Sequence, residues 1–221
     1  MTDPVVGVVL AAGASRRMGD AGPKQLLSWL GRPLVRHATQ TMRTADVAHT
    51  LVVVGHRGDE VAAALDELVE RSADGRDVEV VRCAAWRDGQ SASLRAGVEA
   101  ARTAGAAAVL VMPCDQPFVD SALLDRLVAA YRAGASRVAV RYGAAEGTSP
   151  GEDSTRVGAP ALFAARHFEA LATLEGDRGA RALLAHRAAE VVTVDADALA
   201  GADIDTLADH RRLSAQGAAL G

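Results

Sequence analysis

The chain has 221 residues, which is enough for one domain with a substantial hydrophobic core. Apolar residues make up 49% of it and aromatic residues only 3%, so small aliphatic side chains must build that core. The formal net charge of -4 argues against a general nucleic-acid-binding surface, which requires an excess of basic residues.

The sequence also bears on the compartment in which the protein works. No apolar run reaches the roughly 18 residues that a membrane-spanning helix needs, and the N-terminus lacks the basic flank of a signal peptide. Cys83 and Cys114 have no metal-ligand spacing, so we interpret them as reduced thiols. These features predict a cytoplasmic protein with no membrane and no nucleic-acid partner.

Short valine-rich segments alternate with amphipathic segments along the chain. In chain order, the predicted strands are Val5–Ala11, Thr50–Gly55, Val78–Arg82, Ala107–Met112, Arg137–Arg141 and Glu190–Val194. Apolar residues between them recur at helical spacing, as Leu34, Ala38 and Met42 do. The alternation predicts a single Rossmann-like α/β domain over residues 1–221, with a mostly parallel sheet and helices on both of its faces.

A glycine-rich basic loop follows the first predicted strand, in the sequence LAAGASRRMGDAGPKQLL. Gly13 allows the backbone to approach a ligand closely, and successive N–H groups in such a loop can point at an anion. Arg16, Arg17 and Lys24 add charge that suits phosphate oxygens. The loop matches neither the P-loop nor the dinucleotide-binding pattern. It therefore predicts a different kind of polyphosphate site, at the carboxyl end of the sheet.

The segment after the fifth predicted strand interrupts the alternation. Residues 141–160, RYGAAEGTSPGEDSTRVGAP, are rich in Gly, Ser, Thr and Pro and show no apolar period. They predict a mobile loop over residues 141–157. Two interpretations of this loop stay open, a lid over a site or a tolerated insertion.

The sequence LAAGASRRMG followed by PKQLL resembles the signature of nucleotidyltransferases of the molybdenum cofactor guanylyl/cytidylyltransferase type. WRDGQSASLRAG, VMPCDQPFV, GAPALF, GDRGARALL and DIDT then follow in the order and rough spacing of the molybdenum cofactor cytidylyltransferase branch. The resemblance implies an enzyme that uses Mg²⁺ or Mn²⁺ to transfer CMP from CTP to a phosphate-bearing acceptor, releasing pyrophosphate. A molybdopterin-type cofactor is the implied acceptor, and a molybdoenzyme is a possible protein partner.

The resemblance also implies roles for individual residues. Arg17 and Lys24 would bind the triphosphate and the transition state, and Asp115 would be the first metal ligand, with Asp203 or Asp205 as the second. The nucleobase would lie among Ala11, Ala12, Gly13, Gly89 and Ser93. The guanylyl branch carries LAGG where this chain has LAAG, so the methyl group of Ala12 favours a pyrimidine. The acceptor would be bound by the second half of the chain, with Gly158, Asp177, Gly179 and Arg181 as candidates.

Some features depart from the cytidylyltransferase branch or fit an ordinary structural role. Leu207 replaces the usual proline after DIDT, although Thr206 can still cap a helix over Leu207–Ser214. Asp120 is placed to cap the helix that follows it, and Asp177 and Arg181 also fit a simple helix start.

Two alternatives for the function stay open. The longer spacing between Gly19 and Lys24 resembles methylerythritol phosphate cytidylyltransferases, which makes such an enzyme, or one with another small acceptor, the first alternative. A non-catalytic nucleotide-binding module or a chaperone of a molybdoenzyme is an alternative of another class. The oligomeric state stays open between monomer and homodimer.

Overall fold

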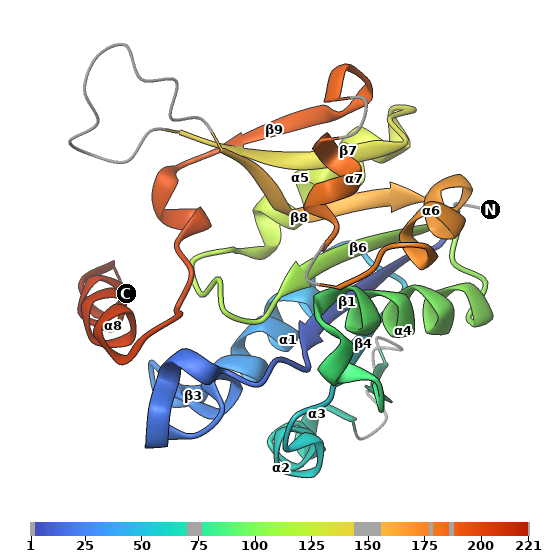
Figure 1. Ribbon diagram of the computed structural model, residues 1–221. Coiled ribbons are helices and arrows are strands. Elements are labelled where there is room, and N and C mark those ends of the chain that lie inside the picture. The colour runs from blue at the N-terminus through green and yellow to red at the C-terminus, as the bar shows by residue number, and fades with distance from the viewer. Residues whose placement is uncertain (1–2, 70–76, 144–155, 177–178, 186–187, 221) are drawn as a thin grey trace.

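The computed structural model describes residues 3–69, 77–143, 156–176, 179–185 and 188–220. A seven-stranded sheet runs through the centre of the molecule (Figure 1). Its strands, in spatial order, are β5 (Val78–Arg82), β4 (His49–Val54), β1 (Val5–Ala11), β6 (Ala108–Pro113), β8 (Arg156–Ala164), β7 (Arg137–Tyr142) and β9 (Val192–Ala196). Only β8 runs antiparallel to its neighbours among these strands, so the prediction of a mostly parallel sheet is confirmed.

The structure corrects the sequence prediction around β8. Residues 156–157 begin this strand and Arg141 and Tyr142 end β7, so neither end of the predicted loop over 141–157 is a loop. The rest of that prediction, residues 144–155, lies outside the described residues. The last strand is also displaced, because Glu190 belongs to a 3-10 turn (Ala188–Glu190) and β9 begins at Val192.

Helices cover both faces of the sheet, as the sequence predicts. The helices α1 (Leu34–Thr44), α2 (Gly58–Ala63) and α5 (Ser121–Arg132) pack their apolar side chains into one core layer. The helices α4 (Gln90–Thr103), α6 (Phe168–Ala172) and α7 (Arg181–Ala185) pack into the other. Figure 1 shows α4 and α6 side by side on their face. Strand residues such as Val8 and Val9 are fully buried, which explains why the strands read as continuous apolar runs. The remaining short helix is α3 (Asp66–Val69).

A third, smaller core joins the segment after β1 to the C-terminal part of the chain. Trp29, from the hairpin of β2 (Ser28–Trp29) and β3 (Arg32–Pro33), packs with Leu213 of α8 (Leu207–Leu220). A Cβ at Gly217 would lie 2.8 Å from the Trp29 ring, so only glycine permits this contact. Figure 1 accordingly shows α8 and the C-terminal end of the chain beside the hairpin.

The start of α8 is fixed by a capping box. The Asp209 N–H donates to the Thr206 hydroxyl oxygen (3.1 Å), and the Thr206 N–H donates to the Asp209 carboxylate (3.0 Å). The predicted cap at Thr206 is therefore confirmed despite the missing proline, and the helix extends beyond Ser214 to Leu220. None of the helices described in residues 3–220 is long and apolar enough to cross a membrane.

Candidate active site

A buried glutamine holds the basic loop after β1. Gln25 is 1% exposed, and its side-chain amide donates to the Gly13 carbonyl oxygen (2.8 Å). The Ser15 hydroxyl donates to Gln25 Oε1 (3.1 Å) and accepts from the Lys24 backbone N–H (3.0 Å). Ser15 has a left-handed φ of 53°, a conformation that non-glycine residues adopt only when other contacts hold it. These bonds fold the loop back on itself and place Lys24 beside the end of β1.

Cys114 and Asp115 follow β6, the strand next to β1. The Cys114 N–H donates to the Leu10 carbonyl oxygen (3.1 Å), which continues the pairing of the two strands. Burial and the charge of Asp115 raise the pKa of the Cys114 thiol to about 12, so this cysteine packs as a neutral side chain. The Ile204 N–H donates to the Asp115 carbonyl oxygen (2.9 Å), and this bond brings the DIDT segment against Asp115.

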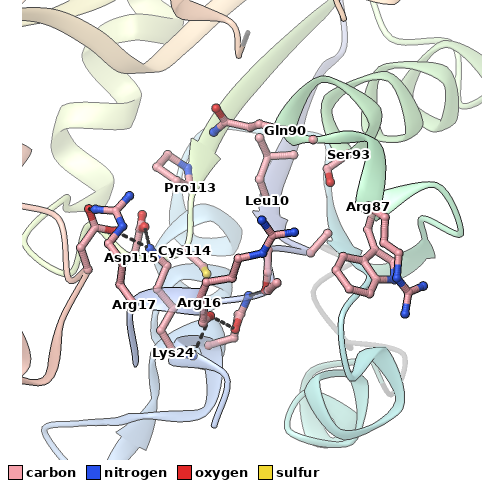
Figure 2. A pocket seen from close by; sticks show the side chains of 18 of the residues that line it. Leu10, Arg16, Arg17, Lys24, Arg87, Gln90, Ser93, Pro113, Cys114 and Asp115 are labelled. Carbon is pink, nitrogen blue, oxygen red and sulfur yellow. Dashed lines mark hydrogen bonds and ion pairs between the residues drawn. The ribbon is translucent and has the colours of Figure 1, made fainter. Parts of the chain in front are cut away.

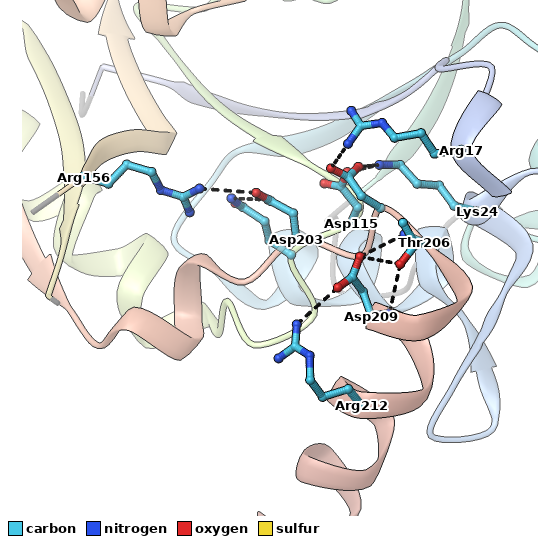
Figure 3. Close-up of polar contacts among 10 residues, drawn as sticks. Arg17, Lys24, Asp115, Arg156, Asp203, Thr206, Asp209 and Arg212 are labelled. Carbon is cyan, nitrogen blue, oxygen red and sulfur yellow. Dashed lines mark hydrogen bonds and ion pairs between the residues drawn. The ribbon is translucent and has the colours of Figure 1, made fainter. Parts of the chain in front are cut away.

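Two basic and two acidic side chains meet where these segments converge (Figure 3). The Lys24 ammonium donates to Asp115 Oδ2 and, at 3.0 Å, to Asp205 Oδ1. Arg17 Nη1 donates to Asp205 Oδ2 at 2.6 Å. The side chains of Lys24 and Asp115 are 16% and 14% exposed, whereas that of Arg17 is 73% exposed. A nearly buried lysine therefore joins two carboxylates, and an exposed arginine lies at the rim.

The cluster keeps its members charged. Burial alone would lower the pKa of Lys24, but the carboxylates of Asp115 and Asp205 outweigh it and raise the pKa above its ordinary value. Burial would raise the pKa of Asp205, but its bonds with Lys24 and Arg17 outweigh burial and lower the pKa. Lys24 and Asp205 therefore stay ionised across the neutral pH range.

Asp115 offers an oxygen that the protein does not use. Its Oδ1 is buried and has no hydrogen-bond partner among the described residues. Within residues 3–220, leaving out the undescribed gaps, no three His, Cys, Asp or Glu side chains converge on one point. Mg²⁺ commonly takes one or two carboxylates and completes its shell with phosphates and water. The pair of Asp115 and Asp205 therefore fits a hard cation that binds together with a phosphate ligand.

The two carboxylates of the DIDT segment face different neighbours, as the alternation of an extended segment predicts. Asp205 faces Lys24 and Arg17. Asp203 accepts instead from Gln116 Nε2 (3.0 Å) and Arg156 Nη1 (3.4 Å), as Figure 3 shows. Burial and the negative charge of Asp115 raise the pKa of Asp203 above its ordinary range.

A cavity of about 690 Å³ opens beside the charged cluster (Figure 2). The basic loop, Asp115 and Asp205 line one end of it, and the turn that precedes α4 lines the other. In that turn the Arg87 guanidinium lies 4.3 Å from the centroid of the Trp86 ring, which packs against His56. A basic end and a planar end within one cavity suit a nucleoside triphosphate.

Most residues predicted to bind the nucleotide line this first cavity: Ala12, Gly13, Arg17, Lys24, Gly89 and Ser93. Ala11 does not. It ends β1, is 1% exposed and packs in the core layer of α1, whereas Ala12 packs on the opposite face. Strand alternation turns the Ala11 methyl group into the core, so its predicted place at the nucleobase depends on its backbone and stays a prediction.

A second cavity, of about 250 Å³, adjoins the first, and Leu10, Gln90 and Pro113 line both. Of the predicted acceptor residues, Gly158, Gly179 and Arg181 line the second cavity. A Cβ at Gly179 would lie 2.5 Å from Gln90 Oε1, so a larger residue there would make the Gln90 side chain move. The fourth candidate, Asp177, lies outside the described residues.

The structure adds residues that the sequence did not single out. Gln25 holds the loop, and the cavities are lined in addition by Trp86, Gln90, Gln116 and Arg156. One signal for this site was present in the composition. Lys24 is the only lysine in the chain, and all the other residues in its total of 24 Lys and Arg are arginines. A single lysine in an arginine-rich chain marks a place where a compact ammonium is needed.

Residues 7–213 match the protein family described as MobA-like NTP transferase domain. The chain is 34% identical over 214 residues to nicotine blue oxidoreductase of Paenarthrobacter nicotinovorans, a comparison that covers 95% of this chain and 96% of that protein.

Solved structures with the same fold extend the comparison. Rv0371c from Mycobacterium tuberculosis H37Rv has a TM-score of 0.75 and 30% identity, covering 97% of this chain and all (100%) of that chain. Rv0371c has also been crystallised in complex with manganese, with a TM-score of 0.70. A nucleotidyl transferase from Methanothermobacter, Mth528, has a TM-score of 0.74 and 25% identity and covers 100% of both chains.

Proposed function

The chain belongs to the MobA-like NTP transferase family, and on that premise we propose that it transfers CMP from CTP to a phosphate-bearing acceptor. A molybdopterin-type cofactor is the acceptor that we favour. The observation that carries the proposal is the pair of joined cavities. One holds the basic loop and the charged cluster, and the other holds the predicted acceptor residues.

The reaction requires little covalent help from the protein. An acceptor oxygen attacks the α-phosphorus of the nucleotide, a new P–O bond forms, and the bond to the pyrophosphate leaving group breaks. Lys24 and Arg17 would stabilise the negative charge that grows on the phosphate oxygens, because both line the first cavity beside the charged cluster. A divalent cation held by Asp115 and Asp205 would neutralise phosphate charge and balance these carboxylates.

The choice of Asp205 over Asp203 as the second metal ligand follows from their neighbours. Asp205 shares the Lys24 ammonium with Asp115, so both carboxylates lie against one cation already. The manganese complex of Rv0371c supports a divalent ion in this family. Asp203 is assigned to the acceptor side, because it lines the second cavity.

Pyrophosphate release tests the proposal directly. The protein is incubated with Mg²⁺ and each of CTP, GTP, ATP and UTP, together with molybdopterin, methylerythritol phosphate or a sugar phosphate in turn. We expect release with CTP and molybdopterin. Release only with another acceptor would keep nucleotidyl transfer and correct the acceptor, and no release with any combination would contradict the proposal.

We predict that the wild-type protein prefers CTP over GTP and that Ala12→Gly relaxes this preference. Ala12 lines the first cavity and is 2% exposed, so its methyl group occupies space that a purine ring would need. One buried methylene commonly discriminates by roughly 10-fold or more. The measurement is kcat/KM for both nucleotides.

The control for this prediction is Ala14→Gly, because Ala14 lines the same cavity on the phosphate loop. Removing the Ala14 methyl group should leave the ratio of kcat/KM for CTP to kcat/KM for GTP unchanged. Equal turnover of CTP and GTP by the wild-type protein would defeat the argument from Ala12.

We predict that Arg181→Ala raises KM for the acceptor about tenfold and leaves KM for CTP nearly unchanged. Arg181 is exposed at the second cavity, where its guanidinium can pair with an acceptor phosphate, and it does not line the first. Steady-state kinetics with each substrate varied in turn provide the test. Arg102→Ala, which removes an exposed arginine of α4, is the control. An effect confined to CTP would place this region on the nucleotide side.

A second candidate function is an oxidoreductase, because nicotine blue oxidoreductase is 34% identical over almost the whole chain. The loop after β1 does not match the dinucleotide-binding pattern, so we rank this function second. The absorbance of NADH or NADPH in the presence of a redox dye distinguishes the two functions. Dye-dependent oxidation without pyrophosphate release would favour the oxidoreductase.

A further inference from the structure

The lining of the second cavity includes a polar group made by Gln116, Arg156 and Asp203, which come from three separate segments. Gln116 follows β6 and is 5% exposed. Its Nε2 donates to Asp203 Oδ1 at 3.0 Å, while its Oε1 is buried and has no hydrogen-bond partner among the described residues. Turning the amide over would place Oε1 against a carboxylate, so the amide oxygen is the atom left free. A buried acceptor without a partner costs free energy, which a bound donor would recover.

The positive charge of Arg156 is already engaged. Its Nη1 lies 3.4 Å from Asp203 Oδ2, its Nη2 donates to the Gly201 carbonyl oxygen, and its guanidinium lies 5.2 Å from the centroid of the Tyr142 ring. The atoms left to meet a ligand in this polar group are therefore mainly acceptors, the amide oxygen of Gln116 and the carboxylate of Asp203. Anions do not suit such a surface, whereas N–H and O–H groups do.

The walls of the cavity mix apolar and polar groups, and its volume is small. Val111, Val157 and Tyr142 line it together with the polar group. Its volume of about 250 Å³ is below the roughly 300–1,000 Å³ of most ligand pockets. It can therefore take the head group of an acceptor but not a second nucleotide.

We propose that Gln116 and Asp203 select the acceptor by binding adjacent N–H or O–H donors on its head group. This inference rests on the proposed function and deepens it, because it gives the acceptor a phosphate that pairs with Arg181 and a donor-rich end that binds Gln116 and Asp203. An amino-substituted heterocycle, such as a pterin, presents neighbouring N–H groups, and a polyol presents neighbouring hydroxyl groups. The two share this chemistry, and a second phosphate at the head group is excluded.

Binding without nucleotide tests the assignment. The full chain is titrated calorimetrically with 6-hydroxymethylpterin, with erythritol and with inorganic phosphate. We expect one of the first two to bind and Asp203→Asn to weaken that binding by about tenfold to a hundredfold, because the asparagine amide turns an acceptor into a donor. Gln116→Leu should also weaken binding, because leucine has no acceptor oxygen.

The matched control is Asp195→Asn, which changes an exposed aspartate of β9 in the same way and should leave binding unchanged. The melting temperature of each variant shows whether it is folded. Binding of the pterin identifies a heterocyclic head group and binding of erythritol a polyol, and either supports the assignment if Asp203→Asn weakens it. Binding of neither, binding insensitive to Asp203, or displacement of the bound pterin or erythritol by phosphate would overturn it.

Titration with CTP separates this inference from the proposed function. A folded Asp203→Asn variant should bind CTP as the wild-type protein does, because Asp203 lines the second cavity and not the first. Pyrophosphate release, together with head-group binding that Asp203→Asn leaves unchanged, would refute this inference but not the proposed function. Head-group binding that depends on Asp203, without pyrophosphate release from any nucleotide, would refute nucleotidyl transfer and leave this binding site standing.

Discussion

Replacing Asp115 with asparagine is expected to lower turnover by roughly a hundredfold to a thousandfold while the protein stays folded. A neutral amide is a poorer ligand for a hard cation than a carboxylate is. The substitution acts on Oδ1, which is buried and without a partner among the described residues, and on Oδ2, which accepts from Lys24. The measurement is turnover against Mn²⁺ concentration, with Mn²⁺ binding followed by electron paramagnetic resonance.

Asp120→Asn is the matched control for this change. Asp120 lies five residues further along and caps α5 by accepting from the Leu123 N–H (2.8 Å). Asparagine caps helices about as well as aspartate, so this variant should keep its stability, its turnover and its metal dependence. If Asp115→Asn also binds Mn²⁺ and turns over normally, the carboxylate pair is not the metal site.

The sequence was sufficient for the architecture because the strands are buried on both faces. Val8, Val9 and their neighbours show the continuous apolar runs of a parallel sheet, and these were found at close to their true bounds. The segment of β8 was missed because glycine and proline occupy its first half, including Gly158 and Pro160. Pairing with both β6 and β7 outweighs the weak strand preference of these residues, and no local pattern reveals that pairing.

Site residues that directly follow a strand could be predicted from the sequence. Those whose roles depend on long-range contacts could not. Lys24 and Asp115 could be placed at one sheet edge, since β1 and β6 are parallel strands. The division between Asp203 and Asp205 could not be read from the sequence, because it depends on neighbours about ninety residues or more away, such as Gln116 and Lys24. The Ile204 N–H bond to the Asp115 carbonyl oxygen sets this segment against Asp115, and no local pattern reveals that bond.

Replacing Lys24 with methionine is expected to lower turnover about a hundredfold or more and to change KM for CTP only slightly. The ammonium is held by Asp115 and Asp205 in the free protein, so it gives up two partners when it moves to the nucleotide. Losing these two ion pairs offsets most of the free energy that the ammonium gains by contacting the bound nucleotide in the ground state. Its net stabilisation therefore appears when charge builds on the leaving pyrophosphate.

The same substitution should lower the free energy of unfolding by about 3 kcal/mol, because it leaves the Asp115 carboxylate without a cation and Asp205 with Arg17 alone. Methionine retains much of the length and the apolar stem of lysine, so lost packing contributes little. Mn²⁺ should restore the melting temperature of the variant more than it raises that of the wild-type protein, since it takes the place of the ammonium. A variant with unchanged turnover, or one that Mn²⁺ does not stabilise, would contradict this account of Lys24.

The composition allows Lys24 to be observed directly. Because it is the only lysine, reductive methylation with a ¹³C label gives one side-chain resonance besides that of the chain's amino terminus. Its titration should lie above that of an ordinary lysine, because Asp115 and Asp205 outweigh the effect of burial. Adding CTP with Mg²⁺ should shift the resonance, and Asp115→Asn should lower its pKa, since one of the two partners is lost. A resonance that titrates as that of a free lysine and does not shift when CTP and Mg²⁺ are added would place Lys24 outside the site.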